Sequence, residues 1–447
     1  MGRQSYCLYK KSLIEIYLEN CLLMPRYKII IYLLLIILFV DSLPALLEAR
    51  FNVHLPGFVF TSLNLSYLIY FSWLTFGVLR KKGVKINIAY FPLLFALYIV
   101  VNTYINNISF LKIGIYLVYF LALFCLTYEF SANKISYKTG IPFIFKVLYS
   151  FFFFLFVFYI LSINKGITFS FREVRVNGFL SNANEDAGAF ITLFPFALYW
   201  SYKRNIKIIY RIFLIASFLF VLVFLNGTRF AIIGFVVSMF LFYYKLGGHK
   251  LSKSIGLYIA IIFIPIVFIS GTFSSITNSI DIDKLVAGEN INDNNLVGRI
   301  GGIWIPASLN TIEEDLFFGK GLATWFDQEV TFTANEHENL INTNRAPHNS
   351  FVYNFYQLGL FGVLIFIWLF YTGIVRLNRT FSRSKNPDLL LIYSTLLASW
   401  VGFIFWNCFA NAWPVISIPI LVILFSVSVF INYKMFNNEV VDNSSRT

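Results

Sequence analysis

Charged residues are scarce in this sequence: Asp, Glu, Lys and Arg make up only 13% of the 447 residues, whereas 58% are hydrophobic and 20% are aromatic. An ordinary soluble domain carries about twice that charged fraction, roughly a quarter. The mean hydropathy is +0.72, so the chain carries more apolar surface than a soluble fold can bury. The composition excludes ordinary soluble enzyme architectures and predicts a polytopic membrane protein.

Proline, glycine and cysteine are also few. Twelve Pro and 25 Gly stand against 53 Phe and 27 Tyr, which excludes a disordered or collagen-like chain. Of the four cysteines, Cys7 and Cys21 precede the first apolar segment, while Cys125 and Cys408 fall inside apolar segments. We therefore expect no external disulfide, and a disulfide-stabilised scaffold is excluded.

Motifs for nucleotide and metal binding are missing. The sequence has neither a GxxxxGK[ST] nor a GxGxxG pattern, which argues against direct use of ATP. His337 and Glu338 lack the second histidine of HExxH, and His54 and His249 lie in other loops. We therefore expect no metal site and no cofactor. The sequence also lacks the internal repeats and paired broken helices of many transporters.

What the sequence does contain is a series of apolar segments, each about 20 residues long, the length needed to cross a hydrocarbon core of about 30 Å. They predict an all-α protein with about twelve transmembrane helices. The expected spans lie within 29–47, 58–79, 86–105, 108–128, 141–163, 187–201, 206–225, 229–244, 255–271, 350–375, 388–407 and 413–432. The weakest is 187–201, because its apolar run is short and Glu185 and Asp186 precede it.

The distribution of basic residues gives an orientation. With both termini in the cytoplasm, most Lys and Arg residues fall in short cytoplasmic loops, as the positive-inside rule requires. The net charge of +13 is then explained by topology and requires no nucleic acid. The segment before the first span is too charged for a cleavable signal peptide and is typical of an interfacial helix.

One external loop, 271–347, is much longer than the others, with four basic and eleven acidic residues. It divides the chain into a transmembrane bundle of about nine helices (1–270), the loop itself, and C-terminal transmembrane helices with a cytoplasmic tail (348–447). Loops of this length are usually functional or disordered. An amphipathic pattern from about 297 to 312 favours order. The cytoplasmic loops are too short to hold a catalytic domain.

Arginine is prominent among the external basic residues. Five of the nine external basic residues are Arg172, Arg175, Arg229, Arg299 and Arg345. The planar guanidinium binds phosphate oxygens through two parallel hydrogen bonds and keeps its proton, which suits a pyrophosphate at a membrane surface. Pairing with the acidic loop or with lipid headgroups is an equal alternative for Arg172, Arg175 and Arg345. Arg229 follows a tight turn at the mouth of a span, where an unpaired charge is costly, so it needs an anionic partner.

His348 lies where the long loop returns to the membrane. Its neighbours Pro347 and Asn349 suit the start of a helix. A neutral imidazole at a helix N-terminus can accept the proton of a sugar hydroxyl as a general base. The alternative is an interfacial histidine that caps the helix or bonds to the loop.

These residues together resemble a known family. His348 and Asn349 are followed by nine residues and then by Gly359 and Gly362. Further matching features are the turn Gly227, Thr228 and Arg229; Arg299 followed by Trp304 and the GKG at 319–321; and NGFLSNANEDAGAF at 177–190. In these features, which span about 177–365, the chain resembles the O-antigen ligase and polymerase superfamily of envelope glycan enzymes.

The resemblance implies inverting, metal-independent glycan transfer at the outer face of the bacterial cytoplasmic membrane, from an undecaprenyl-diphosphate-linked oligosaccharide to a sugar hydroxyl. It implies catalytic roles for Arg229, Arg299 and His348, and suggests substrate contacts for Arg172, Arg175 and Asn349. The partners expected are the lipid-linked donor, a glycan or lipid A core acceptor, membrane lipids and a chain-length regulator, with no nucleic acid and no cofactor.

Several alternatives stay open. A polymerase extends a lipid-linked glycan, whereas a ligase transfers finished glycan to the lipid A core; the bias toward Phe, Ile, Asn and Lys favours a polymerase. A flippase or transporter of lipid-linked sugars is disfavoured, because Lys112 is the main ionisable residue within a span and the long loop stays unexplained. A different lipid-linked glycosyltransferase would use an acidic residue after the first span, Asp41 or Glu48.

Overall fold

The computed structural model describes most of the helical part of the chain. The described residues are 26–37, 57–80, 91–132, 140–162, 183–226, 228, 230–246, 304–322, 331–332, 341–342, 349–381, 386–409 and 418–428. The expected span at 255–271 lies outside these residues. So do the N-terminal segment before 26, most of the long loop 271–347, and the C-terminal tail.

Within the described residues, a helix covers all or part of each remaining expected span, which confirms the helical fold class. The helices before the long loop are 26–37, α3 (Gly57–Leu79), α4 (Phe91–Ile105), α5 (Phe110–Ala132), α6 (Gly140–Ser162), α7 (Ala183–Lys203), α8 (Ile208–Phe220) with the π-helical turn η2 (Val221–Asn226), and Phe230–Leu246. Those after it are α15 (Ser350–Phe381), α16 (Pro387–Phe409) and Ile418–Ser428. Within the loop lie α13 (Ile305–Asp315) and a short antiparallel pair, β1 (Thr331–Phe332) and β2 (Ile341–Asn342).

Length and surface chemistry both indicate a membrane protein. In the part of the chain that the structure describes, four segments are long and apolar enough to cross a membrane: Ile113–Phe130, Gly140–Leu161, Ser350–Arg379 and Pro387–Cys408. Ile69, Trp73 and Phe76 of α3 are more than 60% exposed and share one helix face. An apolar stripe of this kind is unfavourable in water and favourable against lipid tails. The chain is therefore a helical, multi-pass membrane protein.

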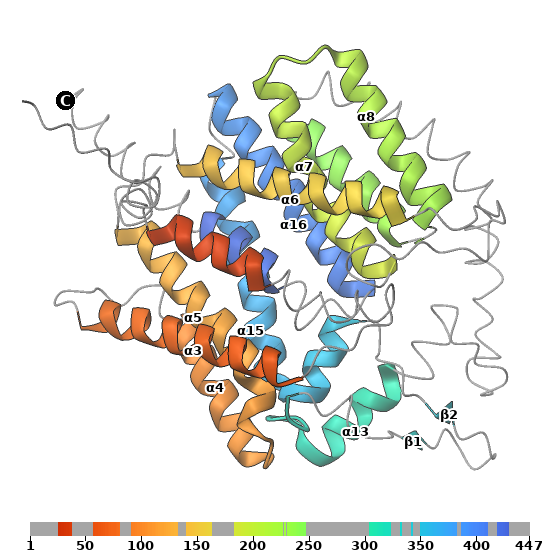
Figure 1. Cartoon of the computed structure of the whole chain (residues 1–447). Helices are drawn as coiled ribbons and strands as arrows, with labels where there is room; N and C mark the ends of the chain where they lie inside the picture. The colour runs from red at the N-terminus through yellow and green to blue at the C-terminus, as the bar shows by residue number, and fades with distance from the viewer. Residues whose placement is uncertain are drawn as a thin grey trace, which may run out of the picture.

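α7 and α16 form a closely packed antiparallel pair (Figure 1). At one end, Lys203 of α7 forms a salt bridge of 2.8 Å with Asp388 of α16. At the other end, Trp406 Nε1 donates to Glu185 Oε2 at 2.9 Å. Gly402 permits the close approach, because a Cβ at that position would lie 2.6 Å from the Ile191 carbonyl oxygen. The span expected to be the weakest is thus part of one of the best-packed helices.

The remaining helices lie on either side of α15. α3, α4 and α5 form one group, and α6, α7, α8 and α16 form another, with α15 running between them (Figure 1). Phe370 of α15 packs against Trp400 of α16, with ring centroids 5.7 Å apart. Helix 418–428 joins the two groups through a hydrogen bond between the hydroxyls of Ser426 and Thr127 of α5 (3.2 Å) and through Ser428 Oγ, which accepts from Trp400 Nε1 (2.9 Å).

Candidate functional site

α15 is broken at Gly359, whose backbone has φ 62° and ψ −162°. Phe351 contacts Phe366 and Phe370, with ring centroids 5.1 and 5.9 Å apart. In a straight helix, residues 351 and 366 would be separated by about 22 Å. Residues 350–358, here called the half-helix, therefore fold back alongside residues 360–381, the long segment.

This break corrects the expectation of one continuous span at 350–375. The long segment extends for about 33 Å, which is enough to cross a membrane, whereas the half-helix extends for about 13 Å and is not. Hydropathy does not distinguish the half-helix from the long segment, because both are apolar and they follow each other directly in the sequence.

Each glycine of these motifs occupies a position where a larger side chain would not fit. The backbone angles of Gly359 lie in a region that is essentially restricted to glycine. A Cβ there would also lie 2.5 Å from the Phe317 carbonyl oxygen. Gly319 has φ 67°, and its Cβ would lie 2.5 Å from the Gly359 amide nitrogen. At Gly362 a Cβ would overlap the Leu358 side chain. Two backbones thus meet directly, one from the GKG sequence and one from the break in α15.

Residues 316–321, which follow α13 and are here called the docking segment, supply hydrogen-bond partners to the backbone groups that the break leaves open. Four backbone hydrogen bonds join them: Lys320 N to Tyr356 O (2.8 Å), Gly321 N to Gln357 O (2.9 Å), Leu360 N to Leu316 O (2.8 Å) and Phe361 N to Phe317 O (3.5 Å). Unpaired backbone groups are very costly in a membrane. The docking segment therefore stabilises a break that the bilayer would otherwise penalise.

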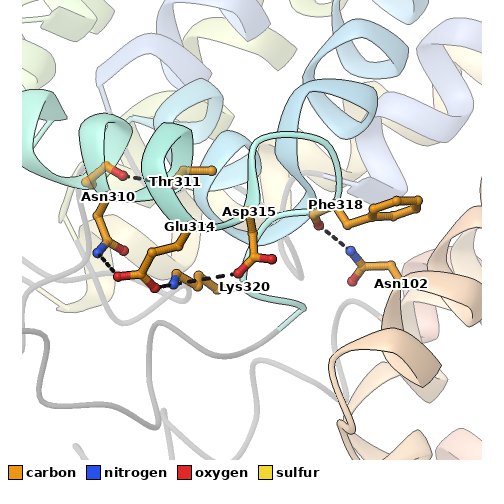
Figure 2. Close-up of polar contacts among 8 residues, drawn as sticks. Asn102, Asn310, Thr311, Glu314, Asp315, Phe318 and Lys320 are labelled. Carbon is orange, nitrogen blue, oxygen red and sulfur yellow. Dashed lines mark hydrogen bonds and ion pairs between the residues drawn. The ribbon is translucent and has the colours of Figure 1, made fainter.

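α4 completes this arrangement with two polar side chains. The Tyr98 hydroxyl donates to the Leu358 carbonyl, and the Asn102 amide Nδ2 donates to the Phe318 carbonyl. Figure 2 shows Asn102 reaching across from α4 to the docking segment. The Tyr98 and Phe318 rings are stacked, with centroids 6.2 Å apart. Sequence reasoning missed both residues, since neither belongs to a motif; a polar Asn within an apolar span was the available signal.

Lys320 is the cation of the docking segment, and it faces the acidic end of α13. Its ammonium group forms ion pairs with Glu314 and, at 3.7 Å, with Asp315 (Figure 2). Partial burial lowers the pKa of Lys320 from its ordinary value. Glu314 also accepts a hydrogen bond of 2.8 Å from Asn310.

α13 covers part of the stretch expected to be helical, 297–312, so that expectation is confirmed from 305 onward.

The start of the half-helix is capped as the sequence predicted. Asn349 is buried, and its Oδ1 accepts hydrogen bonds from the amides of Phe351 (2.9 Å) and Val352 (3.1 Å). These are two of the amides that a helix start leaves without partners. His348 precedes Asn349 directly in the sequence and lies outside the described residues.

A second cluster lies at the start of α7. Thr228, which precedes Arg229 in the sequence, donates through Oγ1 to Asn184 Oδ1 at 3.3 Å. The next residue, Glu185, is buried and accepts the hydrogen bond from Trp406. Two motifs of the resemblance, the Asn-rich segment and the Gly-Thr-Arg turn, therefore meet here. The sequence predicted no role for Glu185 or Trp406, and Glu185 counted only against the span.

The structure describes the neighbours of the predicted site residues, but only one of those residues itself. Asn349 is the one predicted site residue among those described. The remaining five lie outside the described residues: Arg172, Arg175, Arg229, Arg299 and His348. What the structure brings together is the docking segment with the half-helix, and residue 184 with residue 228.

Comparison with known proteins identifies this part of the chain. Residues 212–367 match the family model described as O-antigen ligase. No curated protein matches the chain. The matched range starts in α8 and ends in the long segment of α15, so it contains Thr228, α13, the docking segment and the break at Gly359. Over this range, which is 156 of the 447 residues, the chain is similar to the O-antigen ligase family.

Proposed function

We propose that the chain transfers glycan from an undecaprenyl-diphosphate-linked oligosaccharide at the outer face of the cytoplasmic membrane, and that it polymerises a surface polysaccharide. The family match over 212–367 is the observation that carries this proposal. The broken α15 supports the proposal, because the glycines of two motifs lie at one place in the structure. Gly359 at the break packs directly against Gly319 of the GKG sequence, and Gly362 packs against Leu358.

In the proposed topology the chain crosses the membrane about twelve times, with both termini in the cytoplasm. The large loop 271–347 lies outside, between the bundle 1–270 and the C-terminal part 348–447. This orientation agrees with the salt bridge of Lys203 and Asp388, which falls at the end of α7 and α16 assigned to the cytoplasmic side. It also puts α13 and the half-helix on the donor side.

The proposed chemistry is a single inverting displacement. A base removes the proton of an acceptor hydroxyl, the hydroxyl oxygen attacks the anomeric carbon of the donor, and the bond from that carbon to the diphosphate oxygen breaks. His348 serves as the base, one residue before the helix cap. Arg229 and Arg299 stabilise the negative charge that develops on the diphosphate, so that the proposed reaction requires no metal.

Asn349, Arg172 and Arg175 are proposed as further contacts to the substrate. The Oδ1 of Asn349 is already engaged in the helix cap. Its contact with substrate therefore falls to the Nδ2 group, which donates and so suits a phosphate or hydroxyl oxygen.

The second candidate is transfer of finished glycan to the lipid A core, and the description of the matching family as O-antigen ligase favours it. Deleting the gene and separating the lipopolysaccharide on a gel distinguishes the candidates. Loss of the polymerase leaves a single repeat on the core. Loss of a ligase leaves a bare core while lipid-linked polymer accumulates. Repeats trapped on the cytoplasmic side would instead indicate a flippase.

Topology is tested separately by cysteine labelling. Cysteines introduced at 285–295 should react with a membrane-impermeant reagent in intact spheroplasts. Protection at these positions would contradict the external placement of the loop. Cysteines introduced at 80–85, a loop assigned to the cytoplasm, provide the matched control and should stay unlabelled.

A further inference from the structure

The half-helix buries a polar face. Ser350, Tyr353, Asn354 and Gln357 follow the spacing i, i+3, i+4 and i+7, which places them on one side of the helix. All four are completely buried. In a helix packed inside a membrane protein such a face is normally apolar, and polar side chains at such positions usually have a function.

Asn354 is the most unusual of these residues. Among the described residues neither its amide nitrogen nor its amide oxygen has a hydrogen-bond partner. Gln357, on the same face, interacts with the Tyr353 hydroxyl. Each unpartnered buried polar group is expensive for a fold to keep. By contrast, Asn102 nearby uses its Nδ2 to hold Phe318. The docking segment and α4 therefore satisfy the backbone of the break but do not contact the amide atoms of Asn354.

The chemistry of the two amides indicates what they recognise. A carboxamide both donates and accepts hydrogen bonds, as a sugar hydroxyl does, whereas a phosphate group only accepts. Neither the half-helix nor α4 contains an Asp, Glu, Lys or Arg residue. Lys320 of the docking segment, which bonds to the half-helix through its backbone, is already paired with Glu314 and Asp315. The pair of amides thus suits a neutral, hydroxyl-rich group.

We propose that Asn354 and Gln357 form a subsite for a sugar of the lipid-linked glycan, separate from the arginines that hold its diphosphate. The subsite rests on the proposed function and names the part of the substrate that the half-helix reads. Because the face is closed in this structure, the sugar enters when the half-helix shifts against its neighbours. Asn354 then gains the hydrogen bonds that it lacks, and Gln357 exchanges its contact with Tyr353 for one with the sugar.

The test uses the full-length protein in lipid nanodiscs and two probes. One probe is undecaprenyl diphosphate that carries the native oligosaccharide repeat, and the other is undecaprenyl diphosphate without sugar. Wild-type protein should bind the first probe more tightly than the second. Asn354→Leu should reduce this preference by about tenfold to a hundredfold, the loss expected for two hydrogen bonds. Binding of the sugar-free probe should stay unchanged.

Stability separates recognition from a structural role. Asn354→Leu removes two unpartnered polar atoms from the interior, so without substrate it should unfold at a higher temperature than the wild type. A structural asparagine would show the opposite change. Gln357→Met, which keeps the side-chain length, gives a second variant that should also lose the preference for the sugar-bearing probe. Asn407→Leu in α16 is the matched control, because Asn407 is buried with an unpartnered Oδ1; it should keep the sugar preference.

The possible failures are distinguishable. If wild-type protein transfers glycan and prefers the sugar-bearing probe while both variants keep that preference, the subsite is wrong and the proposed function stands. If wild-type protein neither prefers the sugar-bearing probe nor transfers glycan, the proposed function fails, and the subsite fails with it. A competition experiment adds free oligosaccharide repeat to protein that has bound the sugar-bearing lipid probe. Because the lipid anchors the donor, the probe should stay largely bound; complete displacement by the free repeat would instead indicate a site for an acceptor sugar and would contradict the proposal.

Discussion

Substituting Gly359 by alanine should unfold the joint between α15 and the docking segment. The backbone at this position lies in a region that costs other residues roughly 1 to 3 kcal/mol. The added Cβ would also lie 2.5 Å from the Phe317 carbonyl oxygen and 2.6 Å from the Phe318 amide nitrogen. Both neighbours are backbone atoms, so the docking segment itself has to move.

The size of the effect follows from what that movement breaks. Four backbone hydrogen bonds join the docking segment to the break. At about 1 kcal/mol each, they add roughly 4 kcal/mol to the backbone strain, for a total of roughly 5 to 7 kcal/mol. That loss is similar to the whole stability of many proteins. Gly359→Ala should therefore be nearly absent from the membrane or inactive.

The assay compares Gly359→Ala with Gly114→Ala in α5. A Cβ at Gly114 would meet nothing within 4 Å, so this helical glycine should accept alanine with unchanged or slightly higher stability. Protein level in the membrane, unfolding temperature in detergent and glycan transfer are measured for both variants. Equal stability and equal transfer in the two variants would refute the reasoning.

Further substitutions test the other contacts. Tyr98→Phe removes the hydroxyl that holds a carbonyl at the break and should cost about 1 to 3 kcal/mol of stability; an unfolding temperature equal to wild type would contradict this. Trp406→Phe keeps an aromatic ring but removes the indole N–H that donates to the buried Glu185, and it should cost at least as much stability; an unfolding temperature equal to wild type would contradict this. Arg299→Lys should stay partly active, because a point charge replaces the planar fork. Arg299→Ala removes the charge and should lose donor binding; full activity of this variant excludes the diphosphate role. His348→Ala should bind donor normally but transfer about 10² to 10⁴ times more slowly, and wild-type transfer should fall as pH drops through the pKa of a histidine; unchanged turnover excludes a catalytic role.

Features with a local signature could be predicted from the sequence. Apolar length located the helices, since a bilayer requires about 20 apolar residues whatever the neighbouring helices do. Asn349 was predicted to start a helix because its side chain can reach its own backbone two and three residues ahead, and the structure confirms the cap. The amphipathic pattern in the external loop predicted α13 for the same kind of local reason.

The features that were missed depend on contacts between distant parts of the chain. Gly359 was recognised as part of a motif, yet nothing in the sequence around it shows that residues 316–321 fill the break. Tyr98 and Asn102 lie more than 200 residues away from their partners. Glu185 looked like a defect at the edge of a span, because its partner Trp406 lies in a helix near the other end of the chain.

The break in α15 also sets an order of events during biogenesis. When residues 350–381 first enter the bilayer, a straight helix satisfies all of its own backbone hydrogen bonds, and a bent one does not. The bend becomes favourable only after the docking segment and Tyr98 have reached Gly359. We therefore expect insertion to come before bending, with the half-helix among the last parts of the molecule to reach its final position. A chain that lacks residues 304–322 would insert normally and stop as a straight, inactive α15.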